Sequence, residues 1–194
     1  QIEPYVDAEP PTRMLPMIGR PRRRRATDGL HPLHHTGVWE ICLLTEGEVT
    51  WFQGPTAHTL VAGSVLVTPP DVEHGTAVGG FEPSDLAWLQ IDPAAFEPCA
   101  ALDVCRRNQK FAWVDARFER MLELHEAIMD ECREPADDSE SIIAGLLEVM
   151  VGYVTRGARE PSDASAAAPP AVQRMLNHVD ANLDRRVSLA ELTK

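Results

Sequence analysis

Two stretches decide the fold, residues 34–51 (HHTGVWEICLLTEGEVTW) and residues 60–75 (LVAGSVLVTPPDVEHG). In the first, the apolar run 38–45 meets a turn at 46–48 and returns at 49–52, which predicts a β-hairpin. In the second, Gly63 divides a pair of strands that ends at two prolines. Residues 84–92 predict one more strand. Many short strands with Gly and Pro turns are typical of a sandwich or a barrel.

The pattern changes to a helical one after residue 114. Residues 115–132 and 139–157 each place their apolar side chains on one stripe, which predicts two amphipathic helices. Asp115 is expected to cap the first helix and Gly157 to end the second. His125 lies on the apolar stripe and is expected to make helix contacts. Each stripe is wide enough to cover a barrel and still present a face to a partner.

Composition narrows the class of protein. The 194 residues carry a net charge of −12. Because nucleic acid is also negatively charged, this chain is not expected to bind it unaided. We see no signal peptide and no uncharged apolar run near the length of about 20 residues that spans a bilayer. The cysteines form no CxxC pair. This pattern is typical of free thiols, without a catalytic or metal-binding role, in a reducing compartment. We therefore expect a cytoplasmic protein that does not enter a membrane.

The C-terminal part differs from the body of the chain. Residues 158–170 are small, polar and proline-containing, and predict a linker. A helical pattern resumes at 171–183. Ser188 and Glu191 then form a capping box, which predicts a new helix from about residue 189. A helix of only six residues, from 189 to 194, has marginal stability by itself. We therefore expect a further domain to follow.

The histidines and the glutamate of the first stretch raise a question of chemistry. Period-two alternation places Glu40, Cys42 and Leu44 on one strand face. A carboxylate buried there needs a partner. The partner is a metal ion, a histidine such as His35 or His74, or an arginine from 22–25, and the sequence leaves these alternatives open. Trp51 and Trp88 fit either the core or a pocket.

The spacing of these residues resembles the cupin pattern over residues 31–78. The elements that match are His35, Glu40 and Gly47 in the first motif, and Gly63, Pro69 and His74 in the second. The resemblance implies a small double-sheet jelly roll. It also places His35, Glu40 and His74 at three metal-ligand positions, a set that suits Fe(II), Mn(II) or Zn(II).

Two positions depart from the cupin pattern. Leu33 stands where the first motif has a histidine, and Asp71 where the second has a glycine. The reduced set of three ligands can hold a catalytic ion, and it is also what a cupin without metal would retain.

The order of barrel, two helices, linker and capped helix resembles the AraC family of transcription regulators. The resemblance rests on the two stretches above, on AWLQIDP (87–93), and on VQRMLNHVDANLDRRVSLAELTK (172–194). It implies a mainly β fold with C-terminal helices, a cupin-like jelly-roll barrel followed by an amphipathic helix pair. The implied parts are a barrel sensor with an N-terminal arm (1–110), a helical dimerisation segment (111–157), the linker (158–170) and the truncated start of a helix-turn-helix domain (171–194).

By this resemblance we expect a ligand-responsive regulator and no enzyme. A small effector, a sugar or another polar metabolite, would bind inside the barrel, and the chain would form a homodimer. The basic run 20–29 and Glu40 hint at a polar or anionic effector. DNA would be bound through a recognition helix beyond Lys194. The expected ligand-binding residues are His35, Glu40, Trp51, His74 and Trp88.

No catalytic residue and no cofactor are expected, and no nucleophile motif or phosphate loop is present. The alternative function is a metal-dependent cupin enzyme, a dioxygenase or an isomerase, that uses His35, Glu40 and His74. A third class is a regulator whose barrel is purely structural.

Overall fold

The computed structural model describes residues 12–20, 22–23, 36–76 and 84–160. Within these residues the chain forms two antiparallel sheets. The larger, sheet A, has the strand order β1-β8-β3-β6-β9, and β2 also pairs with β8. Its strands are β1 (Ile18–Gly19), β2 (Arg22–Arg23), β3 (Trp39–Glu46), β6 (Ser64–Thr68), β8 (Ser84–Ile91) and β9 (Ala112–Val114). The smaller sheet B has the order β5-β4-β7, with β4 (Glu48–Gln53), β5 (Thr56–Val61) and β7 (His74–Thr76).

The two strands of the predicted hairpin are present as β3 and β4, joined at Gly47, but they do not pair with each other, so the prediction of a hairpin is wrong. This glycine has φ of 83°, a conformation that most side chains avoid. The chain passes from sheet A to sheet B at this turn, because β3 pairs with β6 and β8 whereas β4 pairs with β5 and β7. The two sheets therefore face each other across an interior.

Strand β3 is buried on both faces, so sheet A is the middle layer of the structure. On one face, Ile41 and Leu43 join a large apolar cluster with the helices. On the other face, Cys42 and Leu44 join a second cluster with Val49 of sheet B. Burial of a side chain such as Leu43 contributes about 1.5–3 kcal/mol relative to exposure.

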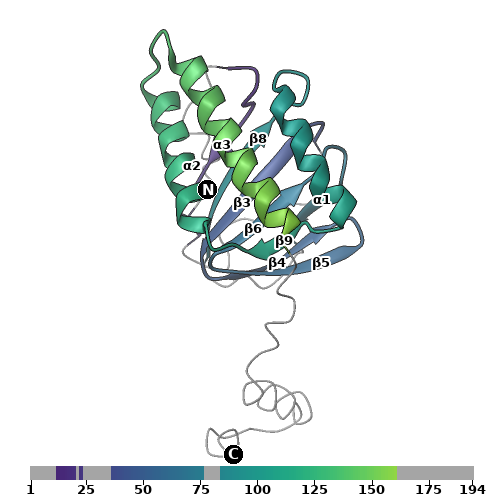
Figure 1. Cartoon of the computed structure of the whole chain (residues 1–194). Helices are drawn as coiled ribbons and strands as arrows, with labels where there is room; N and C mark the ends of the chain where they lie inside the picture. Colours follow the sequence, from purple (N-terminus) through teal and green to yellow (C-terminus); the bar gives the residue numbers. More distant parts are fainter. Residues whose placement is uncertain (1–11, 21, 24–35, 77–83, 161–194) are drawn as a thin grey trace, which may run out of the picture. The chain divides into compact units, whose positions relative to one another are not determined.

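Four helical segments accompany the strands. They are η1 (Glu97–Leu102), α1 (Asp103–Asn108), α2 (Phe118–Arg133) and α3 (Ser139–Arg159). Figure 1 shows α2 and α3 running alongside each other over the face of the sheet that carries β3 and β8. Helix α3 contributes buried side chains to the large cluster at every third or fourth position. These residues are Ile143, Leu147, Met150, Val151 and Val154.

Helix α3 is also the one described helix that is long and apolar enough to cross a membrane, with a mean hydropathy of 1.3. Its buried apolar residues belong to the large cluster that packs on sheet A. The helix ends at Arg159, two residues beyond the predicted end at Gly157. The described residues all belong to one compact unit, which ends at Glu160. The predicted linker beyond residue 160 and the predicted helices at 171–194 lie outside the described residues.

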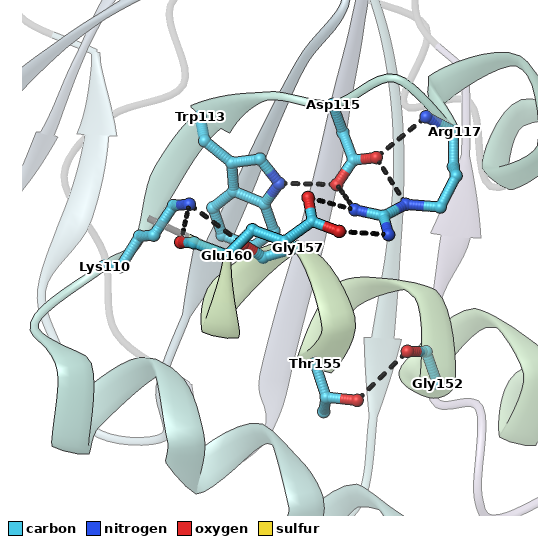
Figure 2. A network of polar contacts seen from close by, with 8 residues as sticks. All are labelled: Lys110, Trp113, Asp115, Arg117, Gly152, Thr155, Gly157 and Glu160. Atoms are coloured by element: carbon cyan, nitrogen blue, oxygen red, sulfur yellow. Dashed lines mark hydrogen bonds and ion pairs between the residues drawn. The ribbon is translucent and has the colours of Figure 1, made fainter. Parts of the chain in front are cut away.

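A network of polar contacts holds the end of α3 (Figure 2). Lys110 Nζ donates to the carbonyl oxygens of Gly157 and Glu160, both at 2.9 Å. Arg117 forms a two-pronged ion pair with the Glu160 carboxylate, at 2.7 and 2.9 Å. A cation near the C-terminal carbonyls also complements the helix dipole. The last turn of α3 is thereby fixed to the segment that follows α1.

The prediction that Asp115 caps α2 is wrong. The cap position is Arg117, which makes no side-chain capping bond. Asp115 instead accepts hydrogen bonds from the indole N–H of Trp113 at 2.7 Å and from Arg117 Nε at 2.8 Å. Burial raises the pKa of Asp115, but the bonds from Arg117 and Trp113 outweigh it, so the pKa lies below its ordinary value. The backbone N–H of Arg117 also donates to Asp115 Oδ1, at 2.8 Å, so the carboxylate binds the residue at the cap position and not the first turn of the helix.

Candidate functional site

The interior between the two sheets is graded from apolar to polar. The strand register places Leu44 beside Ser64 and Leu86 at one end, and Glu40 beside Thr68 and Gln90 at the other. From sheet B, the pair Gln53 and His74 lies at the polar end. A layer with two tryptophans, Trp51 and Trp88, lies between the ends. The polar end coincides with the start of β3 and the ends of β4, β6 and β8.

Glu40 is the centre of the polar end and is 5% exposed. Its Oε2 accepts a hydrogen bond from Gln90 Nε2 at 3.0 Å. Its Oε1 accepts one from Cys42 Sγ at 3.4 Å and lies 3.3 Å from His74 Nε2. Both carboxylate oxygens are therefore engaged by side chains of the barrel. Burial raises the pKa of Glu40, but His74, Gln90 and Cys42 together hold it below its ordinary value.

Both ring nitrogens of His74 face oxygen atoms. Nδ1 lies 2.7 Å from the carbonyl oxygen of Val72, and Nε2 faces Glu40. A carbonyl and a carboxylate can only accept, so this geometry calls for the imidazolium form, which has two N–H donors. Burial lowers the pKa of His74, but Glu40 and the Val72 carbonyl raise it further, so the net shift is upward. Glu40 and His74 form a buried ion pair.

The two tryptophans border this pair. The ring of Trp51 stacks on that of His74, with centroids 6.2 Å apart and planes inclined by 26°. Trp88 is half-buried and lies opposite Cys42 on β8. Its carbonyl oxygen lies 3.2 Å from Nε2 of His125, which is buried on α2. His125 was expected to make helix contacts, but its bond is to a strand and connects α2 to β8.

The structure brings together four of the five residues expected to bind ligand: Glu40, Trp51, His74 and Trp88. His35 lies outside the described residues. In the part of the chain that the structure describes, no group of three or more His, Cys, Asp or Glu side chains is arranged to hold a metal ion. Of the alternatives for Glu40, the structure shows the contact with His74, whereas the side chains of the arginines at 22–25 lie outside the described part of the chain and that alternative stays a prediction. The metal alternative needs His35 and stays a prediction.

The arginine run contributes one described side chain. Arg20 lies 3.3 Å from Asp85 and also contacts Glu126 of α2, so it bridges strand and helix and does not reach Glu40. Burial lowers the pKa of Arg20, but its hydrogen bond to Glu126 and the charge of Asp85 outweigh it, and the pKa is raised.

Three residues of the site had no signal in the sequence analysis. Gln90 bonds Glu40, Gln53 donates to the carbonyl oxygen of Val67 at 3.1 Å, and Thr68 lies opposite Glu40. Each is a lone polar residue at the end of an apolar strand. Alternation on β8 would have placed Gln90 beside Glu40, had the pairing of β3 with β8 been known.

Comparison with known structures gives remote neighbours. Apo ToxT from Vibrio cholerae has a TM-score of 0.49 and 11% identity, over 91% of this chain and 68% of that one. The AraC-like transcriptional activator CuxR has a TM-score of 0.49 and 9% identity, over 77% of this chain and 52% of that one. An RmlC-like cupin from Methanocaldococcus jannaschii has a TM-score of 0.33 and 15% identity, over 43% of this chain and 75% of that one.

The family assignment rests on sequence. No protein of curated function matches this chain. The model of the AraC-like ligand binding domain matches residues 20–144, which is more than half of the chain. The match covers both sheets, the polar end of their interior and α2. It confirms the resemblance over these residues and the cupin-like fold expected from the two opening stretches, while the helix-turn-helix start expected at 171–194 stays a prediction. This chain belongs to the family of AraC-like ligand binding domains.

Proposed function

We propose that this chain is the sensor part of a cytoplasmic, homodimeric transcription regulator whose effector binds between the two sheets. The observation that carries the proposal is the polar end of the interior, where a buried Glu40–His74 pair lies beside Trp51 and Trp88. A barrel with a purely structural role gains little from burying ionised groups, because their desolvation offsets most of their attraction. Concave sites lined by aromatic rings and a few polar groups are typical of small-molecule binding.

The rest of the regulator follows from the family and the sequence. DNA would be bound through the helix-turn-helix domain that begins in residues 171–194. A regulator that binds DNA must lie in the compartment that contains DNA, which supports the cytoplasmic location. The family's regulatory role supports a binding protein without catalytic activity. A metal-dependent enzyme would need His35 to complete its ligand set.

The test is a thermal unfolding experiment. The protein is stripped of small molecules by dialysis and heated with a small-molecule extract of the cells from which the gene comes. We expect the extract to raise the unfolding midpoint, because a compound that binds only the native state stabilises it. Trp88→Leu should abolish the rise, whereas Trp113→Leu, on the far side of β6, should keep it. A wild-type midpoint that the extract leaves unchanged would refute the sensor role.

A further inference from the structure

Residues 106–117, which we call the strap, run from the end of α1 through β9 to the residue before α2. The guanidinium of Arg106 donates to the carbonyl oxygen of Pro70 at 3.4 Å and lies over the ring of Trp39, 5.0 Å from its centroid. Pro70 belongs to the loop before β7, and Trp39 is the first residue of β3. These two elements carry the buried ion pair of the site, so Arg106 ties the strap to the polar end.

The middle of the strap is part of sheet A. Its strand β9 pairs with β6, and beyond that pairing the carbonyl oxygen of Phe111 accepts a hydrogen bond from the backbone N–H of Val67 at 2.8 Å. The next residue on β6 is Thr68, which lies opposite Glu40. The strap is therefore bonded to the strand whose end borders the polar end of the interior.

The strap also holds the last turn of α3 (Figure 2). Besides the two lysine bonds and the ion pair described above, Asn108 Nδ2 donates to the carbonyl oxygen of Ala158 at 2.9 Å. Gly157 lies so close to Trp113 that a Cβ on this glycine would be 2.5 Å from the indole Nε1. Because even one added carbon has no room between the strap and this turn, a shift of one displaces the other.

The contacts of the strap differ in exposure, and this decides which of them can open. The side chain of Asp115 is 0% exposed, whereas those of Arg117 and Glu160 are 19% and 55% exposed. The side chain of Arg106 is 46% exposed. Exposed ion pairs are weak and are screened by salt. The outer contacts at both ends of the strap therefore open at little cost in free energy while the inner ones stay closed.

We propose that the strap couples the loop at the polar end to the last turn of α3, so that opening of either one destabilises the other. The contacts form one contiguous path between these two places, as energetic coupling requires. Glu160 is the last described residue of the unit, and the predicted linker follows it. A change at the polar end would thereby alter the turn from which the linker leaves. The regulatory use of the coupling rests on the proposed function, but the coupling itself needs no effector.

Amide hydrogen exchange of the full chain, followed residue by residue by NMR, measures the coupling without a ligand. The N–H of Glu160, bonded to the carbonyl oxygen of Arg156 at 3.2 Å, reports on the last turn of α3. The N–H of Asp71, bonded to the carbonyl oxygen of Thr36 at 2.6 Å, reports on the loop. The N–H of Val151, in the middle of α3, reports on global unfolding.

The first variant, Arg106→Met, deletes the guanidinium and keeps the apolar part of the side chain. We expect it to raise the exchange rate of Asp71 directly and that of Glu160 through the strap, each by at least twofold, with no change at Val151. The matched control, Arg107→Met, removes the same charge from the neighbouring exposed position and should leave all three rates at their wild-type values.

The second variant tests the coupling from the other end, because a coupling free energy is reciprocal. Glu160→Gln breaks the ion pair with Arg117 and should raise the exchange rate of Asp71 by at least twofold. Its matched control is Glu148→Gln, at an exposed position of α3, which should leave the exchange rate of Asp71 unchanged.

An effect of either variant that stays at its own end of the strap would show two independent openings and overturn the proposal. An equal rise at Val151 would mean that the whole unit is destabilised, which overturns the proposal as well. Neither result bears on the sensor role, which the extract experiment decides. Conversely, an extract that leaves the midpoint unchanged would refute the sensor role and leave the coupling in place.

Discussion

At the scale of single residues, the chemistry of the site concentrates on Glu40 and His74. Motif spacing predicted both residues and their proximity, because the family pattern fixes strand positions that face one interior. It did not predict Gln90, Gln53 or Thr68, which complete the polar end. Their placement depends on which strands pair, and long-range pairing leaves no local trace in sequence.

The ion pair makes stability depend on pH. The pKa of His74 is raised above its unfolded value of 6.5, so its contribution is complete below pH 6.5 and is lost as the pH rises through the folded pKa. The pKa of Glu40 is lowered below 4.5, so its contribution is complete above pH 4.5 and is lost as the pH falls. The pair is therefore at its most stabilising between these two values.

We expect Glu40→Gln to reduce the free energy of unfolding by about 3 kcal/mol near pH 5.5, since it leaves the buried imidazolium without its anion. The loss should shrink as the pH rises through the raised pKa of His74, above which the imidazole is neutral in both proteins. Urea unfolding at a series of pH values measures the difference. Glu48→Gln, on the exposed face of β4, serves as the control and should show no such trend. A difference that is the same at pH 5.5 and pH 9 would contradict the ion pair.

Gly157 is a second position where one added atom, a Cβ, is expected to change the stability of the protein. A Cβ there would lie 2.5 Å from Trp113 Nε1 and 2.9 Å from Cε2, and closer still to Asp115 Oδ2. We expect Gly157→Ala to destabilise the protein by about 1–3 kcal/mol through overpacking. Gly145→Ala, where the new atom meets nothing within 4 Å, should stabilise it by about 0.5–1 kcal/mol through helix propensity. Urea denaturation of both variants checks the opposite signs.

At the scale of elements, the long and periodic segments were predictable and the short ones were not. The helical period predicted α2 and α3, and apolar runs bounded by Gly and Pro turns predicted β3 to β6 and β8. Strand β9 has three residues and α1 has six, which are too few to show a period. Their surroundings define them, since β9 pairs with β6 and the contacts of Lys110 hold the end of α3.

The role of α3 can be tested by removing it. A fragment that ends at Pro135 loses the buried side chains of α3, from Ile143 to Val154, and exposes the outer face of sheet A. We expect this fragment to lack a cooperative thermal transition, because each lost large side chain costs about 2–5 kcal/mol. A fragment that ends at Glu160 keeps the whole first unit and should melt like the full chain. Circular dichroism measures all three melts. A cooperative melt of the shorter fragment would show that the barrel is stable without α3.

At the scale of the whole first unit, sheet A is shared by two cores. Glu40 and Cys42 face the interior between the sheets, while Ile41 and Leu43 face the helices. A ligand that shifts β3 or β8 therefore acts on helix packing through the same strands, and His125 adds a direct bond from α2 to Trp88. Sequence predicted a barrel and a helix pair as successive parts. It did not show that one sheet joins them, because periodicity tells which residues are buried and not which layer covers them.

The homodimer proposed above requires a surface through which two copies contact each other. Helix α3 buries one side against sheet A and exposes Ile142 and Val149 on the other, at 38% and 46% exposure. These residues lie seven apart, two helical turns along one line, with half-buried Leu146 and Tyr153 beside them. Apolar residues in this spacing are typical of a helix that packs on a partner helix. We propose this face of α3 as the dimer contact expected from the sequence.

A charge on that face tests the proposal. We expect Val149→Glu to convert a dimer into a monomer, since it places a carboxylate in an apolar contact, and to leave the melting temperature of the monomeric unit almost unchanged. Sedimentation velocity over a range of concentrations measures the state of association. Val114→Glu makes the same substitution at a valine that is 65% exposed on β9, outside the Ile142–Val149 face of α3, and should leave the dimer intact. If Val149→Glu sediments as the wild type does and Val114→Glu dissociates, the contact lies at the edge of sheet A and not on α3.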